Sequence, residues 1–322
     1  MVKTIPEIAS VLKKSQKLAI FCHTQPDGDT VGSAMALCYA LRKMGKTADA
    51  YCDEPPTEGM REFLREGEIS LEMRGVKYDT LVAVDCGDIF RLGVFSDMFE
   101  KHPNTVVLDH HMGKPFGKYC YIADFSSTAE IIFDLLNHLK IDLDRQISTM
   151  LYIGLITDTG NFMHANTNAN TFAVASDLAK RDIHIAKLSR VFFRDSSFAR
   201  TKLVGRVISR MRSYYGGLFC LIYVKKSDFD EFGLTEEAAK NIVDYAINIK
   251  TALVGISLVE ASENVYRVSI RGKEFDIRSI AERFGGGGHK FAAGCQISGF
   301  FEDVADKLER FVGERLEEAK II

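Results

Sequence analysis

Short, uniformly apolar segments alternate with segments of helical periodicity along the first part of the chain. Residues 18–22, 80–84 and 105–108 are apolar almost throughout and end at polar residues, so the sequence predicts a strand at each. Apolar residues recur at helical spacing in residues 30–44, 128–139, 147–156 and 170–181. Apolar strands alternating with helices are typical of a parallel sheet covered on both faces. We therefore expect an α/β fold here.

The pattern changes further along the chain. Residues 184–212 have helical periodicity without strands and are expected to form a connector. Beyond them, residues 253–259 and 265–270 flank a short polar turn and predict a hairpin, and residues 301–319 predict a terminal amphipathic helix. We expect three parts: an α/β domain at 1–183, the helical connector at 184–212 and a smaller α+β domain at 213–322.

Residues able to bind metal stand at the ends of the apolar segments. They are His23, Asp27, Asp29, Asp85, His110 and Asp158. Ligands of parallel sheets gather at the carboxyl ends of the strands, so we expect these distant positions to converge at one sheet edge. Carboxylate and imidazole without thiolate suit Mn²⁺ or Mg²⁺ and are unlike structural zinc sites. The set predicts a hydrolytic metal centre.

None of these residues is informative alone. An aspartate in a turn commonly makes only local hydrogen bonds, and Asp85 could simply cap the next turn. The sharpest signal is Asp109-His110-His111 at the end of an apolar strand. One core histidine beside one surface histidine would not account for all three residues there. The hypothesis of a metal site therefore depends on the whole set.

A run of glycines marks the second half. Gly285–Gly288 is followed by His289, and could be a flexible linker or an anion site. The run is short and lies between a predicted helix and an apolar segment, which favours the anion site. Successive glycines can point backbone N–H groups at a phosphate, and Arg271 could add a bidentate contact.

Composition limits the class of partner. The 322 residues carry 41 Lys and Arg against 44 Asp and Glu, a net charge of −3, so a long duplex bound along its phosphates is not expected. No stretch approaches the roughly 18 apolar residues of a membrane span. The N-terminus predicts a capped helix at Thr4–Glu7 and no signal peptide. The seven cysteines are spaced apart and are expected to be reduced, so we expect a cytoplasmic protein.

Taken together, these motifs resemble the DHH phosphoesterase superfamily, in the subfamily with a C-terminal DHH-associated domain and a GGGH motif. The resemblance spans nearly the whole chain and is most similar to the nanoRNases, also described as bifunctional oligoribonuclease and pAp phosphatase proteins. It identifies residues 1–183 as the metal-binding catalytic domain and residues 213–322 as the substrate-binding domain. It also implies a homodimer.

The resemblance implies a role for each motif residue. One divalent ion, most often Mn²⁺, would be held by His23, Asp27 and Asp85, and a second by Asp29, Asp85, His110 and Asp158. His111 would contact the scissile phosphate, and Asp109 would orient a neighbouring histidine. The second domain would bind a substrate phosphate through Arg271, Gly286, Gly287, Gly288 and His289.

The expected activity is hydrolysis of very short RNA and linear dinucleotides such as pApA to nucleoside 5′-monophosphates. Action on 3′-phosphoadenosine 5′-phosphate (pAp) and on cyclic di-AMP is a further expectation. Two alternatives stay open. One is a pyrophosphatase or polyphosphatase with the same metal core, and the other is a nucleotide sensor without turnover.

Overall fold

The computed structural model describes residues 3–322, which fall into two units that divide between Asp195 and Ser196. The division lies inside the expected connector. Helix α8 (Ile185–Phe193) belongs to the first unit and α9 (Phe198–Ser209) to the second. The expected boundaries at residues 184 and 212 remain predictions.

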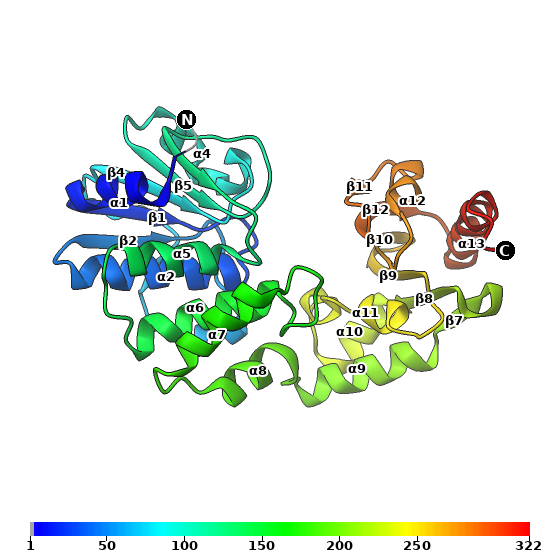
Figure 1. The fold of residues 1–322 in the computed structure, drawn as a ribbon. Helices are drawn as coiled ribbons and strands as arrows, with labels where there is room; N and C mark the ends of the chain where they lie inside the picture. The colour runs from blue at the N-terminus through cyan, green and yellow to red at the C-terminus, as the bar shows by residue number, and fades with distance from the viewer. Residues whose placement is uncertain (1–2) are drawn as a thin grey trace. The chain divides into compact units, whose positions relative to one another are not determined.

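The first unit is built on a six-stranded parallel sheet in the order β3-β2-β1-β4-β5-β6 (Figure 1). Its strands are β1 (Lys17–Phe21), β2 (Thr47–Tyr51), β3 (Ile69–Ser70), β4 (Thr80–Val84), β5 (Thr105–Asp109) and β6 (Tyr119–Ile122). The three predicted strands are β1, β4 and β5, which lie next to one another. The sequence analysis missed β2, where Asp49 interrupts the apolar run, and the short edge strands β3 and β6.

Helices cover both faces of this sheet, as predicted. They are α1 (Ile5–Lys14), α2 (Gly28–Lys43), α3 (Glu58–Arg61), the 3-10 segment η1 (Ile89–Phe95), α4 (Ser96–Lys101), α5 (Thr128–His138), α6 (Arg145–Asp158), α7 (Ala169–Ala179) and α8. Leu18 and Ile20 of β1 join the core formed with α1, α2, α5 and α6. The alternate residue Phe21 joins the opposite core, with Phe95 and Phe99. Strand residues alternate between faces, so each buried strand contributes to both cores.

Helices α2 and α6 pack unusually closely. A side chain at Gly154 of α6 would place its Cβ 2.6 Å from Oδ1 of Asp29 and 2.7 Å from the Cβ of Ala129. Only glycine leaves enough space at this crossing. The crossing therefore fixes where the first turn of α2 lies relative to α5 and α6.

The second unit contains a six-stranded sheet in the order β11-β12-β10-β9-β8-β7, antiparallel except between β8 and β9. Its strands are β7 (Arg212–Tyr214), β8 (Phe219–Val224), β9 (Val254–Ser262), β10 (Val265–Gly272), β11 (Gly287–Gly288) and β12 (Ala292–Ser298). Its helices are α9, η2 (Tyr215–Gly217), α10 (Lys226–Phe232), η3 (Glu236–Ala239), α11 (Asp244–Ile247), α12 (Arg278–Arg283) and α13 (Phe301–Glu318). The predicted hairpin is β9–β10, and α13 is the predicted terminal helix.

The two faces of this sheet carry separate cores. Phe219 and Leu221 of β8 pack with α12 and α13, whereas Ile222 and Val224 pack with α9, α10 and α11. The unit therefore has its own buried core, distinct from that of the first unit. Among residues 3–322, no helix is both long enough and apolar enough to span a bilayer.

The glycine run is hydrogen-bonded within the second unit. The backbone N–H groups of Gly285, Gly286 and His289 donate to Glu282, Ala281 and Ala292 within the unit. Gly287 and Gly288 form the edge strand β11, paired with β12. These three N–H groups are therefore engaged within the unit, and substrate binding by Gly286, Gly287, Gly288 and His289 stays a prediction. Glycine is needed at Gly288 for a different reason, because its φ of +147° and the close backbone of β12 leave no room for a side chain.

Candidate metal centre

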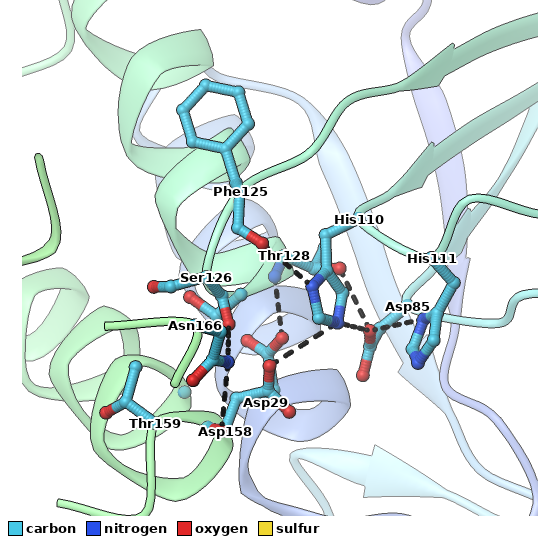
Figure 2. A network of polar contacts seen from close by, with 12 residues as sticks. Asp29, Asp85, His110, His111, Phe125, Ser126, Thr128, Asp158, Thr159 and Asn166 are labelled. Carbon is cyan, nitrogen blue, oxygen red and sulfur yellow. Dashed lines mark hydrogen bonds and ion pairs between the residues drawn. The ribbon is translucent and has the colours of Figure 1, made fainter. Parts of the chain in front are cut away.

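The six predicted ligand residues of the first unit lie just after three strands and at the ends of two helices. Asp85 follows β4, His110 follows β5, His23 lies just beyond β1, and Asp158 is the last residue of α6. Asp27 and Asp29 belong to the first turn of α2. Figure 2 shows His110 lying between Asp85 and Asp158, with the carboxylate of Asp29 beside them.

These side chains form three groups able to hold a metal ion. The groups are His23, Asp27 and Asp85; Asp29, His110 and Asp158; and Asp85, His110 and His111. Within each group the ligand atoms all lie within 4.8 Å of one another. Asp85 and His110 each belong to two groups, so the three groups overlap and describe one centre.

Two of the histidines are held with Nε2 facing the carboxylates. Nδ1 of His23 lies 2.6 Å from the carbonyl oxygen of Thr24, and Nδ1 of His110 lies 3.1 Å from that of Phe125. A carbonyl only accepts, so each ring donates from Nδ1, and in its neutral form it presents a lone pair at Nε2. This is the usual arrangement of a metal-binding histidine, whose second nitrogen is fixed by a hydrogen bond.

The Nε2 atoms lie just too far from the carboxylates for hydrogen bonds. Nε2 of His23 is 3.6 Å from both Asp27 and Asp85, and Nε2 of His110 is 3.5 Å from Asp85 and 3.4 Å from Asp158. Nε2 of His110 is buried and has no hydrogen-bond partner among the described residues. An unpartnered buried nitrogen is costly, and a cation among these atoms would satisfy it. The residues therefore fit divalent metal ions.

The charges at the centre also favour a cation. Burial raises the pKa of Asp29 well above its usual range, and the negative charges of Asp85, Asp158 and Asp27 add to this effect. Burial likewise raises the pKa of Asp158 to about 6. Burial disfavours the charged form of His23, but Asp27 and Asp85 outweigh it and raise its pKa to about 10. Crowded carboxylates hold protons in this way where positive charge is lacking.

Backbone geometry sets the position of Asp85. Its φ is +61°, in the left-handed region that residues with a side chain seldom adopt. Its backbone N–H donates to Leu108 at 3.0 Å, so the turn is held by the neighbouring strand β5. Thr128 donates its hydroxyl to Oδ1 of Asp85 at 2.9 Å. The carboxylate is thus fixed from the backbone and from a side chain.

Asp29 is fixed by the start of helix α5. Its oxygens accept from the backbone N–H of Thr128 at 2.6 Å and of Ala129 at 2.9 Å, and from the hydroxyl of Ser33 at 3.1 Å. The free N–H groups of a helix N-terminus attract a carboxylate. Asp29 therefore joins α2 to α5 as well as facing the centre.

The third histidine is held differently. Oδ1 of Asp109 accepts from both the backbone N–H and Nδ1 of His111, each at 2.9 Å, and Oδ2 accepts from the backbone N–H of Gly87. The hydrogen bond from Asp109 raises the pKa of the His111 ring above its ordinary value. The side chain of His111 is 44% exposed, against 2% for His23, so the His111 ring is open to a ligand from solvent.

Two residues of this region lie outside the predicted site. Thr128 follows the DHH motif in a segment that resembles the family's pattern but that a helix cap also explains, and its hydroxyl contacts Asp85. Arg91, on η1, lies beside His111 and carried no sequence signal at all. Both become visible only when the strand ends and helix starts are assembled.

The other predicted site residues belong to the second unit. Strand register places Arg271 opposite Ala292, and Gly288 opposite Ala293. Arg271 and the glycine run therefore lie at the same end of that sheet. Arg271 is half-buried and His289 is exposed, so both side chains are accessible.

Comparisons with known proteins follow this division. The N-terminal domain of the DHH family matches residues 17–155, and the DHHA1 domain matches residues 200–319. A Thermus thermophilus protein named bifunctional oligoribonuclease and PAP phosphatase NrnA is 32% identical over 305 residues, which covers 92% of this chain and 90% of that protein.

Solved structures share the fold. An exopolyphosphatase-related protein from Bacteroides fragilis superposes with a TM-score of 0.90 at 24% identity, covering 98% of this chain and 96% of that one. The exonuclease RecJ bound to manganese superposes with a TM-score of 0.55 at 14% identity, covering 97% of this chain and 95% of that one.

Proposed function

The chain belongs to the DHH family and carries a DHHA1 domain, and from this premise we propose that it is a metal-dependent phosphoesterase acting on very short RNA. Its substrates would be short oligoribonucleotides and linear dinucleotides, cleaved to nucleoside 5′-monophosphates, and pAp, cleaved to AMP. The observation that carries the proposal is the set of three overlapping ligand groups linked through Asp85 and His110. The name of the Thermus thermophilus relative supports the substrate class.

The metal ligands follow from the groups described above. We propose that one divalent ion is held by His23, Asp27 and Asp85, and a second by Asp29, Asp85, His110 and Asp158. When bound, two such ions acidify a water molecule and neutralise charge on the phosphoryl oxygens. The donor set of oxygens with imidazole nitrogens supports Mn²⁺ as the ion, and RecJ, which shares the fold, binds manganese.

The chain's own residues would orient the substrate. His111 is exposed and its Nδ1 is tied to Asp109, so Nε2 is free to contact an oxygen of the scissile phosphate. Thr128 would keep Oδ1 of Asp85 in place as the charge of the centre changes. In the second unit, the side chains of Arg271 and His289 are proposed to bind a further phosphate of the substrate, beside the segment Gly286, Gly287 and Gly288.

The test is product chromatography with the full chain and Mn²⁺. The substrates are pApA, pAp, RNAs of two to ten nucleotides, and cyclic di-AMP, each with an EDTA control. We expect metal-dependent release of AMP or nucleoside 5′-monophosphates, fastest from the shortest linear substrates. The cyclic di-AMP arm decides whether the cyclic dinucleotide is also a substrate.

Two outcomes would contradict the proposal. Hydrolysis of pyrophosphate or tripolyphosphate without nucleotide cleavage would favour the polyphosphatase alternative. Tight dinucleotide binding without turnover under any divalent ion would favour a sensor.

We propose three further properties. A homodimer follows from the family resemblance alone, and light scattering after gel filtration tests it. The net charge of −3 supports the absence of long-duplex binding, which a mobility-shift assay tests. A cytoplasmic location is supported by the cysteines, which are all free thiols in the described structure.

A further inference from the structure

An arginine beside the metal centre has no partner for its charge. Arg91 lies on η1, is half-buried, and its guanidinium makes no hydrogen bond, ion pair or ring contact with the residues described, 3–322. Arginine heads in such positions normally pair with a carboxylate or stack on a ring. The absence of either leaves five donors free for a ligand.

The position of Arg91 is set by a short, well-anchored segment. Its backbone carbonyl accepts from Thr24 at 2.7 Å, which joins η1 to the loop that carries His23. The segment begins just after Asp85, and Asp88 caps it by accepting from the backbone N–H of Phe90 at 2.6 Å. Arg91 is therefore held by the same two loops that carry metal ligands.

Its guanidinium and the ring of His111 lie around the same glycine. A Cβ built on Gly87 would be 3.7 Å from Cγ of His111 and 4.0 Å from Nη1 of Arg91. Asp109, the carboxylate nearest to His111, accepts from His111 and from the backbone N–H of Gly87, and it forms no ion pair with Arg91. The Arg91 guanidinium and the His111 ring thus flank the same glycine, and no described residue pairs with the guanidinium.

Such an arrangement is suited to a phosphoryl group. Guanidinium binds phosphate through paired N–H donors, and a second donor on a neighbouring ring would fix its orientation. Resting on the proposed function, we propose that Arg91 binds substrate directly, taking a non-bridging oxygen of the phosphate that also contacts His111. The sequence motifs do not include this residue.

The experiment uses the full chain in four forms: wild type, Arg91→Ala, Arg91→Lys and Arg65→Ala. Arg65 is an exposed arginine of the same unit whose side chain has no assigned role, so its removal controls for loss of a positive charge. The measurements are steady-state hydrolysis of pApA with Mn²⁺, calorimetric affinity for Mn²⁺, affinity for inorganic phosphate in the presence of Mg²⁺, and the unfolding temperature.

For Arg91→Ala we expect KM for pApA and the Kd for inorganic phosphate to rise about 10- to 100-fold, the size of a charge-assisted contact. KM should change more than kcat, because a ground-state contact is removed. Arg91→Lys should recover part of the loss, since it keeps the charge without the fork. Mn²⁺ affinity and unfolding temperature should stay at the wild-type values, and Arg65→Ala should match the wild type throughout.

Two results would overturn the proposal. One is an Arg91→Ala protein within twofold of the wild type in both KM and phosphate affinity. The other is a parallel loss of Mn²⁺ affinity, which would make Arg91 a structural support of the metal loops. If the wild type cleaves no nucleotide, the proposed function fails, but the phosphate measurement still decides the role of Arg91.

Discussion

At the scale of the residue, Asp85 carries the most connections in the metal centre. It faces His23 through one carboxylate oxygen, and His110 and His111 through the other. Thr128 donates to it, and its backbone is held in the left-handed region. No neighbouring side chain can take its place. Asp27 faces only His23, Asp158 faces only His110, and Asp109 faces only His111 among the described histidines.

Replacing this residue should remove metal and activity together. For Asp85→Ala we expect kcat/KM to fall by at least about 1000-fold, with loss of measurable Mn²⁺ binding by calorimetry. Asp97→Ala, an exposed aspartate paired only with Lys101, is the matched control and should behave as wild type. An Asp85→Ala protein that keeps full activity would show that the chemistry occurs elsewhere.

The residues that gather at the candidate centre could be predicted from the sequence, because both their type and their place near strand ends were visible. Their detailed roles could not. The Nδ1 partners of His23 and His110 are backbone carbonyls, which any residue provides, so no side-chain pattern signals them. Arg91 was missed for a related reason, since its proximity to His111 depends on how η1 folds back over the sheet edge.

At the scale of the element, uniform hydrophobicity identified the strands at the centre of the first sheet and missed those at its sides. Strand β2 carries Asp49, whose charge is balanced by a 2.6 Å contact with Arg74 from a distant loop. A contact between residues this far apart in the sequence cannot be predicted from the local pattern of the strand. The pairing of β11 with β12 was not predicted for a similar reason, because it joins backbone segments whose side chains carry no strand pattern.

The crossing of α2 and α6 gives an element-level prediction. Gly154→Ala should lower the free energy of unfolding of the first unit by about 1–3 kcal/mol, because the added methyl meets Asp29 and Ala129. Mn²⁺ affinity should fall with it as Asp29 moves. Urea denaturation and calorimetry measure the two effects.

A helix glycine with open space provides the control. A Cβ atom added at Gly205 of α9 would have no neighbouring atom within 4 Å. Gly205→Ala should raise stability by about 0.5–1 kcal/mol through helix propensity alone. If Gly154→Ala and Gly205→Ala changed the free energy of unfolding by the same small amount, close packing at Gly154 would not explain the effect there.

The link between α9 and α10 should make the second unit sensitive to acid. Burial alone would raise the pKa of Asp228, but hydrogen bonds from Arg210, at 2.7 and 3.1 Å, and from the backbone of Lys225 outweigh it and lower the pKa. A carboxyl group whose pKa is lower in the folded state stabilises the fold at pH values above its unfolded-state pKa of about 3.9. This stabilisation is lost as the pH falls through the folded-state pKa.

Asp228→Asn should therefore destabilise the second unit by about 3 kcal/mol at pH 7, and by progressively less as the pH approaches 3. Hydrogen exchange of the β8 and β9 amides in urea measures this unit separately. Asp230→Asn, an exposed change on the same helix, should show no such pH-dependent difference. A constant gap between Asp228→Asn and wild type from pH 7 to 3 would contradict the assignment.

At the scale of the whole molecule, the two units have separate cores, and every proposed metal ligand lies in the first. A ligand that binds only the folded form stabilises by about 2.7 kcal/mol at a hundredfold excess over its Kd. Mn²⁺ at that excess should slow exchange of the most protected amides in β1, β4 and β5 about 100-fold. Amides in β8 to β10 should change far less.

Exchange measured by mass spectrometry with Mn²⁺ and with EDTA checks this prediction. Equal exchange in the first unit under both conditions would mean that the acidic cluster does not bind the ion in solution.

The left-handed backbone at Asp85 has a consequence for how the chain tolerates mutation. A residue with a side chain held there costs the fold roughly 1–3 kcal/mol, which glycine would largely relieve. Selection for cellular abundance alone should therefore favour glycine or asparagine at this position, whereas selection for catalysis should admit only aspartate. In a library of variants scored for abundance and for activity, the two scores should differ most at positions such as Asp85, where a functional side chain has a strained backbone.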